Sequence, residues 1–530
     1  MGNRNRSSPS STTPKLIHNI GFSLINDDLL QNILSRLPAT SFASAASVSR
    51  TWNAACSRIL CCPKLSSAIS INPLPHVALQ EVFDKVMSEP IRPHFAIASV
   101  GPGFEFKDVL PFMVKKLGSR TPIILSSVNG ILGRDALTHE FREVKWIGNT
   151  VEEVPANTGI VLTVGYLPGL KVDVIPLLQK RKVSQGSLID KFVMDIEDYT
   201  SSVSGSSSPP AIIMIGDGSV DLKPILEKLD FAMSMETIIV GDERGQFVYR
   251  SSDASRNVST NQKHSPDAVA LVFARDGNKV HGIGNIEFHF AQSIGVSAIG
   301  PRLKAASVRM QDSCTVTWLT ARREGQQEIL DGQQMLEDID NEMENNMDCV
   351  DLYIGVTRRR NCSVGSDKPR LMTTLALHGV EGGDSEYLYV DGVGIRTGDY
   401  FRFYHPDPKT ALSSTKNVSS ALGNLKLEWD CLNKGTVVNA IDKREAFGGF
   451  IFACIGRGES FFSHHNVDSS PFLENFPGIP VAGIFCGGEI GRGCMSLTAT
   501  GGEEEEGSAR CHLHAYSTVY LVMSYAPLEH

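Results

Sequence analysis

The chain has 530 residues, of which 42% are hydrophobic and 21% charged, so it can bury a large core. Its net charge of −9 argues against a general nucleic-acid binder, which needs a basic face. No apolar run approaches the ~20 residues that a membrane span requires. Eleven cysteines without framework spacing predict reduced thiols. We therefore expect a protein of the cytoplasm, the nucleus or both, with no membrane or nucleic-acid partner.

The N-terminal region predicts a polar tail followed by a short helical module. Residues 1–20 are rich in Ser, Asn, Arg and Pro, which predicts disorder. An apolar helical face follows, with an N-cap at Asn26, and Pro38 is expected to end the helix. A second segment, with large apolar residues at Phe42, Val48 and Trp52, completes a predicted helical hairpin.

From about residue 94 onward, short apolar runs alternate with amphipathic stretches, which predicts α/β architecture. The predicted strands are Phe95–Val100, Ile123–Ser127, Gly159–Val164, Ala211–Ile215, Thr237–Val240, Ala268–Phe273 and Leu352–Val356. The predicted helices are Val77–Ser88, Asp108–Leu117, Leu222–Leu229 and Gly325–Met347. Polar stretches predict loops at Ser201–Pro210, Ser251–Ser265, Asp407–Gly423 and Gly501–Gly507.

One stretch, Leu422 to Leu432, has the spacing of a leucine-rich repeat. A stable stack of such repeats needs about three copies, and the sequence offers no second one. We therefore expect an ordinary strand here.

The order of residues in the helical module resembles the F-box family: Ile33-Leu-Ser-Arg-Leu37-Pro38, then Phe42, then Val48-Ser-Arg-x-Trp52. The resemblance implies an all-α unit over residues 21–68 that binds the Skp-type adaptor of Skp–cullin–F-box (SCF) ubiquitin ligases. Through the adaptor it would reach the cullin and RING subunits. So small a unit cannot bury all its apolar residues, and the sequence does not separate core from interface. The candidates for either role are Leu29, Leu30, Ile33, Leu34, Leu37, Pro38, Val48 and Trp52.

Two later apolar stretches, Phe450–Gly458 and Phe476–Gly491, each run into a glycine turn. Strand ends with glycine turns are where α/β folds place ligands. We expect the four candidate ligand or substrate residues to lie together at adjacent strand ends, with the arginine favouring a thiolate or binding a carboxylate. The alternative is that the glycines only serve turns and that the arginine pairs with the glutamate. These four residues are Cys454, Arg457, Cys486 and Glu489.

The Cys-x-x-Arg-Gly segment and the Gly-Gly-Glu-Ile-Gly turn resemble the C-terminal FIST domain. Upstream, Pro122–Gly133 resembles a segment of the N-terminal FIST half. The resemblance implies a large α/β (α+β) region in two halves, over residues 94–300 and 301–525. It also implies a role in sensing, because FIST domains are regarded as sensory modules for small ligands. The shared spacing of Ser126–Gly133 and Phe485–Gly491 also suggests an internal duplication.

The sequence lacks a P-loop, HExxH, paired CxxC and G-x-S-x-G motif, so we predict no catalytic residue, no metal site and no cofactor. The favoured hypothesis is a non-catalytic substrate-recognition subunit of an SCF ubiquitin ligase, which directs an unidentified protein to ubiquitination and degradation. The alternative hypothesis is an intracellular small-molecule or redox sensor. An enzyme using Arg457, Glu489 and a cysteine remains a third possibility.

Overall fold

The computed structural model describes residues 26–146, 158–178, 185–257, 266–310, 316–343, 351–436, 443–493 and 510–528. They fall into two compact units. The first ends at Cys61 and also includes Ser88–Pro90, and the second comprises Cys62–Met87 and the chain from Ile91 onward. The predicted tail, residues 1–20, and the predicted acidic loop Gly501–Gly507 lie outside the described residues.

The first unit has three helices, α1 (Asp27–Leu34), α2 (Ala39–Ala46) and α3 (Arg50–Ile59). The predicted hairpin is therefore wrong, because Ser49 caps the start of α3 by accepting from the Trp52 N–H and so divides the second segment. Asn26 caps α1 as predicted, through the Leu29 N–H at 2.8 Å. Pro38 stands at the N-cap of α2, whereas α1 already ends at Leu34.

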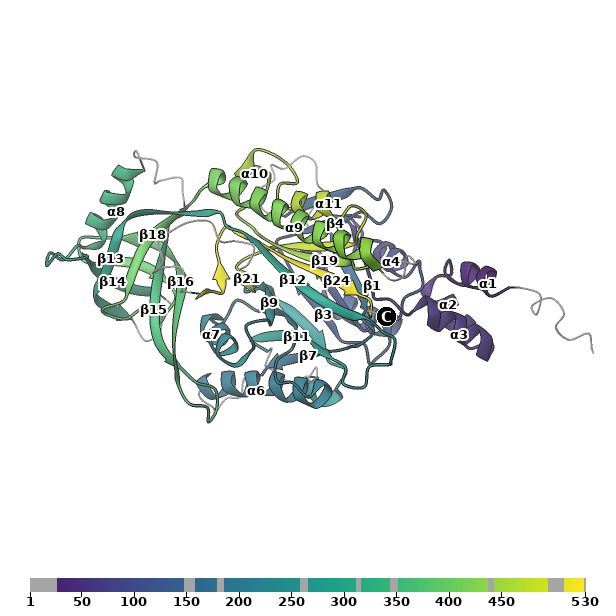
Figure 1. The fold of residues 1–530 in the computed structure, drawn as a ribbon. Coiled ribbons are helices and arrows are strands. Elements are labelled where there is room, and N and C mark those ends of the chain that lie inside the picture. Colours follow the sequence, from purple (N-terminus) through teal and green to yellow (C-terminus); the bar gives the residue numbers. More distant parts are fainter. Residues whose placement is uncertain are drawn as a thin grey trace, which may run out of the picture. The chain divides into compact units, whose positions relative to one another are not determined.

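The second unit contains three segments that repeat one order of elements (Figure 1). Each begins with an edge strand and a helix, followed by two neighbouring parallel strands with one or two helices between them. A further strand then joins another sheet, and a last strand returns to pair within the repeat's own sheet. Repeat 1 comprises β1 (Lys64–Ser70), α4 (Pro75–Val86), β2 (Phe95–Val100), α5 (Phe106–Leu117), β3 (Ile123–Ser127), β4 (Gly130–Arg134), β5 (Phe141–Lys145) and β6 (Ile160–Tyr166).

Repeat 2 comprises β7 (Leu170–Leu177), α6 (Gln185–Ser204), β8 (Ala211–Gly216), α7 (Lys223–Ala232), β9 (Ile238–Asp242), β10 (Phe247–Arg250), the 3-10 turn Ala254–Arg256 and β11 (Ala268–Arg275). Repeat 3 comprises β12 (Asn285–Ser293), α9 (Pro408–Thr436), β19 (Glu445–Cys454), α10 (Glu459–Phe462), α11 (Ser470–Asn475), β20 (Val481–Cys486), β21 (Glu489–Arg492), β22 (Arg510–Cys511), β23 (Leu513–His514) and β24 (Thr518–Ala526).

The three repeats exchange strands in a ring. Sheet A has the order β1-β6-β2-β3-β10, sheet B the order β12-β24-β19-β20-β4-β5, and sheet C the order β7-β11-β8-β9-β21-β23. Strand β4 leaves repeat 1 for sheet B, β21 leaves repeat 3 for sheet C, and β10 leaves repeat 2 for sheet A. The two segments predicted to share an origin are β3-turn-β4 and β20-turn-β21. The structure contains a third segment of the same kind, β9-turn-β10 in repeat 2.

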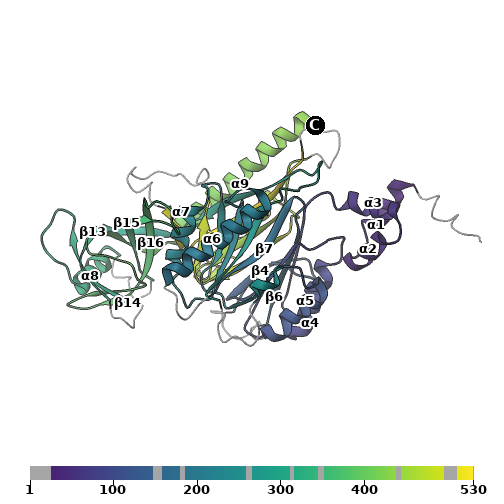
Figure 2. The ribbon, with the colours of Figure 1, turned by 90° about the horizontal axis from the view of Figure 1, so that it is seen from below.

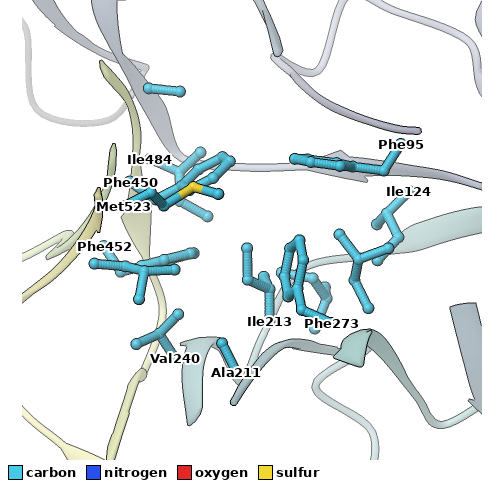
Figure 3. Packing of buried hydrophobic residues seen from close by; sticks show 14 of the residues in the cluster. Phe95, Ile124, Ala211, Ile213, Val240, Phe273, Phe450, Phe452, Ile484 and Met523 are labelled. Carbon is cyan, nitrogen blue, oxygen red and sulfur yellow. The ribbon is translucent and has the colours of Figure 1, made fainter. Parts of the chain in front are cut away.

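The inner faces of the three sheets share one apolar core. Figure 3 shows Phe95 and Ile124 from sheet A, Ile213 from sheet C, and Phe450 and Met523 from sheet B facing one another. Helices cover the outer faces, and Figure 2 shows α4 beside α5 and α6 near β7. Because the central strands are covered on both sides, they read as continuous apolar runs rather than alternating ones.

A closed barrel is inserted into repeat 3, between β12 and α9. It comprises β13 (Val296–Met310), β14 (Val316–Arg323), α8 (Gly332–Glu342), β15 (Tyr353–Cys362), β16 (Arg370–Gly383), β17 (Leu388–Asp391) and β18 (Tyr400–Pro406). The strands pair antiparallel in the order β15-β18-β13-β14-β17-β16, and β16 returns to pair with β15. The barrel contributes no strand to sheets A, B and C. Its interior is filled with side chains such as Leu319, Ile354 and Phe403.

The seven predicted strands are all present, as β2, β3, β6, β8, β9, β11 and β15. The four predicted helices are α4, α5, α7 and α8, although α8 is shorter than predicted because Asp331 and Gln334 form a capping box at its start. The predicted loop Asp407–Gly423 and the predicted strand Leu422–Leu432 are wrong, since both lie in helix α9. No helix among the described residues is long and apolar enough to cross a membrane.

Two predicted boundaries differ from the structure. The helical module was expected to reach residue 68, but β1 starts at Lys64 and pairs with β6 of the second unit. The predicted division between residues 300 and 301 falls inside β13, and sheets B and C combine strands from both sides of it. Strand exchange between the repeats is the physical reason, because it joins the two predicted halves into one compact unit.

Candidate functional site

The helical unit separates its apolar residues into a core and an exposed set. Leu30 and Leu34 are 5% and 0% exposed and pack with Phe42, Ala45, Ala55 and Cys56. Leu37 and Trp52 are half-buried at the edge of this core. The remaining candidates are exposed to solvent: Leu29 (53% exposed), Ile33 (44%), Val48 (64%) and Pro38. We call these four residues the F-box apolar set.

Two features explain this division. On α1, Leu30 and Leu34 lie four residues apart on the inner face, and Leu29 and Ile33 form a parallel row one residue earlier. Val48 stands in the turn between α2 and α3, where no helix covers it. A module this small therefore fills its core with one row and leaves the other row available for a partner.

The second candidate site lies where β19 and β20 end. These strands are parallel, and Cys454 and Cys486 are the last register partners. After Gly487 and Gly488 the chain enters β21, where Glu489 pairs with Asp242 of β9. The glycines permit close approach: a Cβ on Gly488 would lie 2.8 Å from the Glu243 carboxylate. The structure thus brings together Cys454, Cys486 and Glu489.

Buried carboxyl groups dominate the electrostatics of this cluster. Glu489 is fully buried, and burial raises its pKa to about 8, although its Oε2 accepts from the Ser517 N–H and hydroxyl at 3.1 and 3.0 Å. Its Oε1 has no nitrogen or oxygen donor among the described residues, and the Cys454 thiol beside the carboxyl lowers the pKa of Glu489 less than burial raises it. Burial also raises the pKa of Asp242 to about 7, despite hydrogen bonds from the Arg244 and Gly487 N–H groups. At neutral pH this cluster therefore holds protons.

The thiols of Cys454 and Cys486 are also held neutral. Burial raises both pKa values well above the ordinary range, and the neighbouring carboxyls Glu489 and Asp242 raise them further. The expected thiolate is therefore not favoured in this structure, because desolvation outweighs any nearby donor.

Arg457 points elsewhere. Its guanidinium forms a fully buried ion pair with Asp468 at 2.9 Å and donates to the Ser293 and Thr415 hydroxyls at 3.0 and 3.2 Å. It also lies 5.0 Å from the centre of the Phe462 ring. The alternative pairing of Arg457 with Glu489 is wrong, since Asp468 takes that place. Arg457 thereby links β19 to α9 and β12 rather than to the thiols.

A separate pocket of about 220 Å³ lies between α7 and the barrel strands β15 and β16. Its lining carries both charge signs, and the lining residues are Pro224, Glu227, Lys228, Arg360, Asn361, Cys362, Ser363, Met372 and Thr374. Lys228 and Arg360 are held by carboxylates, Asp190 and Asp399. Among the described residues, no group of three or more His, Cys, Asp or Glu side chains is placed to hold a metal ion.

Sequence reasoning missed Asp242, Ser517 and Asp468. Asp242 lies two residues beyond the predicted strand Thr237–Val240 and is the last residue of β9; its place in a Gly-Asp-Glu-Arg sequence after an apolar run was a usable signal. Ser517 and Asp468 carry no such signal, because only the fold brings them to Glu489 and Arg457.

Comparison with known proteins agrees with this architecture. A family model of the F-box domain matches residues 22–64, and one of the FIST C domain matches residues 383–492. An F-box/LRR-repeat protein of Arabidopsis thaliana is 45% identical over 507 residues, which cover 94% of this chain and 93% of the relative. In this chain the leucine-rich stretch Leu422–Leu432 lies within α9.

F-box only protein 22 of Homo sapiens and that of Pongo abelii are each 46% identical over 44 residues, 8% of this chain and 11% of the relative. Those matches are only about as long as the F-box match itself, whereas the similarity to the Arabidopsis relative extends along almost the whole chain. The protein belongs to the F-box family and carries a FIST C domain in its second unit.

Proposed function

We propose that this protein is the substrate-recognition subunit of an SCF ubiquitin ligase, working in the cytoplasm, the nucleus or both. The F-box would bind a Skp-type adaptor, which carries the cullin and RING subunits, and the second unit would bind the protein to be ubiquitinated and degraded. The chain would itself act as an adaptor without catalytic residues. The observation that carries the proposal is the exposed F-box apolar set on a module whose core is already filled.

The division between core and surface sharpens the expected interface. A partner that covers Leu29 and Ile33 removes apolar area from water, which is worth about 25 cal/mol for each Å². Leu30 and Leu34 contribute indirectly, because they hold α1 against α2 and α3. We therefore assign the adaptor contact to the exposed row and a supporting role to the buried row.

The test is adaptor binding by the full chain, measured by biolayer interferometry with the purified adaptor. Leu29→Ala/Ile33→Ala should weaken binding at least ~tenfold, as expected for residues at the centre of an interface. Its thermal unfolding should stay close to wild type, because both side chains are largely exposed.

A matched control removes equally exposed apolar side chains from the second unit. Leu137 and Val280 are 68% and 69% exposed, so Leu137→Ala/Val280→Ala should bind the adaptor like wild type. Wild-type adaptor affinity in Leu29→Ala/Ile33→Ala would refute the assigned interface. Failure of the wild-type chain to bind any Skp-type adaptor would refute the function.

A second candidate function, binding of a small zwitterion such as an amino acid, is supported by the pocket between α7 and the barrel. Glu227 offers a negative group, and Lys228 and Arg360, each already paired with one carboxylate, offer their further N–H groups within the same cavity, which suits a ligand with both charges. Amino acids can be screened by thermal shift, with Ser363→Trp to fill the cavity. Binding should also slow iodoacetamide labelling of half-buried Cys362. No shift and unchanged labelling would exclude this candidate.

A further inference from the structure

The outer surface of the inserted barrel carries cations and aromatic rings in two cross-strand rows. Side chains alternate along each strand, so residues beside inward-facing Leu303, Leu319 and Phe401 point outward. The first row runs across β18, β13 and β14 and contains Tyr400, Lys304 and Arg322, which are direct register partners.

The first row concentrates positive charge around one ring. The Arg302 guanidinium and the Lys304 ammonium lie 4.4 and 5.2 Å from the centre of the Tyr400 ring. Lys304 stands directly opposite Arg322, and like charges in that position destabilise a sheet. The row therefore has an intrinsic cost that an anionic partner would remove.

The second row crosses β14 at Trp318, four residues before Arg322. Arg309 is paired with Trp318, and Trp318 with Tyr389. The Arg309 guanidinium also lies 5.2 Å from the centre of the Tyr387 ring. At about 3.3 Å for each residue, the two rows are about 13 Å apart.

Carboxylates do not neutralise these cations within the described part of the chain. Arg302, Lys304, Arg309 and Arg322 form no ion pair there, whereas other barrel arginines do, such as Arg323 with Asp338 and Arg360 with Asp399. Two nearby carboxylates on the barrel already have partners, since Asp391 binds Arg244 and Asp384 accepts from the Tyr389 hydroxyl. Lys304 and Arg309 are exposed, and Arg302 and Arg322 are half-buried.

We propose that this cationic face, defined by Arg302, Lys304, Arg309 and Arg322, binds an extended acidic segment of a protein substrate. The inference rests on the proposed function, because it names the class of partner that the substrate receptor would select. Charge complementarity carries it: cations without an ion pair among the described residues, flanked by half-buried rings, suit carboxylate or phosphate groups on a peptide.

The spacing of the rows defines the segment further. An extended peptide places residues i and i+4 on the same face, about 13 Å apart. Acidic side chains at those two positions would meet the first and the second row together. Between the rows stand the hydroxyl residues Ser307 and Thr320, which are register partners. Ser307 is half-buried and Thr320 is buried, so of the two only Ser307 is placed to face residue i+2 of the peptide.

The probe is a fluorescein-labelled peptide of twelve residues in a Gly/Ser/Thr background, measured by fluorescence anisotropy with the full chain. Separate peptides carry glutamate or phosphoserine at i and i+4, which distinguishes the two sources of negative charge. Further peptides carry glutamine at i and i+4, or two adjacent glutamates. We expect at least one anionic i, i+4 peptide to bind, and to bind more tightly than the glutamine and adjacent-glutamate peptides.

Lys304→Gln/Arg322→Gln should weaken that binding about tenfold, since two ion pairs are lost. The matched control Lys115→Gln/Lys409→Gln removes the same charge from exposed sites outside the barrel and should bind like wild type. The thermal midpoint of Lys304→Gln/Arg322→Gln should equal or exceed that of wild type, because a like-charge pair is removed.

Three results would overturn the inference: neither anionic peptide binds, the cationic-face variant binds like wild type, or single-stranded RNA of equal charge binds and the peptides do not. Adaptor binding is measured on the same preparations. Loss of peptide binding with intact adaptor binding would reject the acidic-segment inference alone. Absent adaptor binding with intact peptide binding would reject the SCF role and leave the cationic face as a binding surface.

Discussion

Replacing Glu489 with glutamine should stabilise the second unit at neutral pH. The Glu489 carboxyl is fully buried, and its pKa rises from an ordinary 4.5 to about 8 on folding. Between these two pH values the folded chain binds one proton more than the unfolded chain. Stability contributed by this group is therefore complete below pH 4.5 and falls as the pH rises towards 8.

The magnitude follows from this shift. Each pH unit corresponds to about 1.4 kcal/mol, so at pH 7 the buried carboxyl costs about 3 kcal/mol relative to acid pH. The Glu489→Gln side chain has the same shape, does not ionise and can still accept from Ser517. We expect this variant to be more stable than wild type by about 3 kcal/mol at pH 7 and about 4 kcal/mol at pH 8, and to differ by less than about 1 kcal/mol near pH 5.

The assay is urea unfolding followed by circular dichroism at pH 5, 6, 7 and 8. Exposed Glu386→Gln serves as the control and should leave the pH dependence unchanged. The Asp242 carboxyl, whose pKa is raised to about 7, should leave a smaller pH dependence in the Glu489→Gln variant. A variant less stable than wild type at pH 8, with an unchanged slope against pH, would refute the reasoning.

Three further outcomes follow from burial. Leu34→Ala should destabilise the F-box by about 2–5 kcal/mol and weaken adaptor binding only through unfolding, which hydrogen exchange of α1 would detect. A fragment of residues 62–530 should be folded by circular dichroism, whereas 90–530, which lacks β1, should aggregate, and a well-folded 90–530 would contradict this. Asp230→Ala should cost about 3–5 kcal/mol in urea unfolding, because Arg492 loses its buried carboxylate at 2.7 Å, and a loss under 1 kcal/mol would contradict this estimate.

The elements that were predicted correctly are those whose pattern can be recognised within one short segment of the sequence. Strands β8 and β9 are continuous apolar runs because helices and core cover both faces, and such runs are readable in isolation. Helix α9 was missed because its serines, threonines and lysines suggested a loop. Its buried residues nevertheless recur at helical spacing, at Ala411, Thr415, Val418, Leu422 and Trp429.

The barrel and the strand exchange could not be read from the sequence, because both depend on pairings between distant segments. Strand β18 pairs with β13 about a hundred residues upstream, and β21 pairs with β9 some 250 residues upstream. The candidate site shows the same limit. The adjacency of Cys454 and Cys486 follows from two parallel strands, but the choice of Asp468 as the partner of Arg457 depends on α9 and the final strand.

The barrel enters and leaves the protein at a single point. Val296, where β13 begins, is the register partner of Pro406, where β18 ends, and the Asp407 N–H donates to the Gly295 carbonyl at 2.9 Å. A short turn could therefore bridge the two ends if the whole barrel were excised, and the three sheets would lose none of their strands. The same junction would accept a foreign domain whose termini lie close together. This chain thus offers a site at which the proposed recognition surface could be exchanged while the scaffold of three sheets is retained.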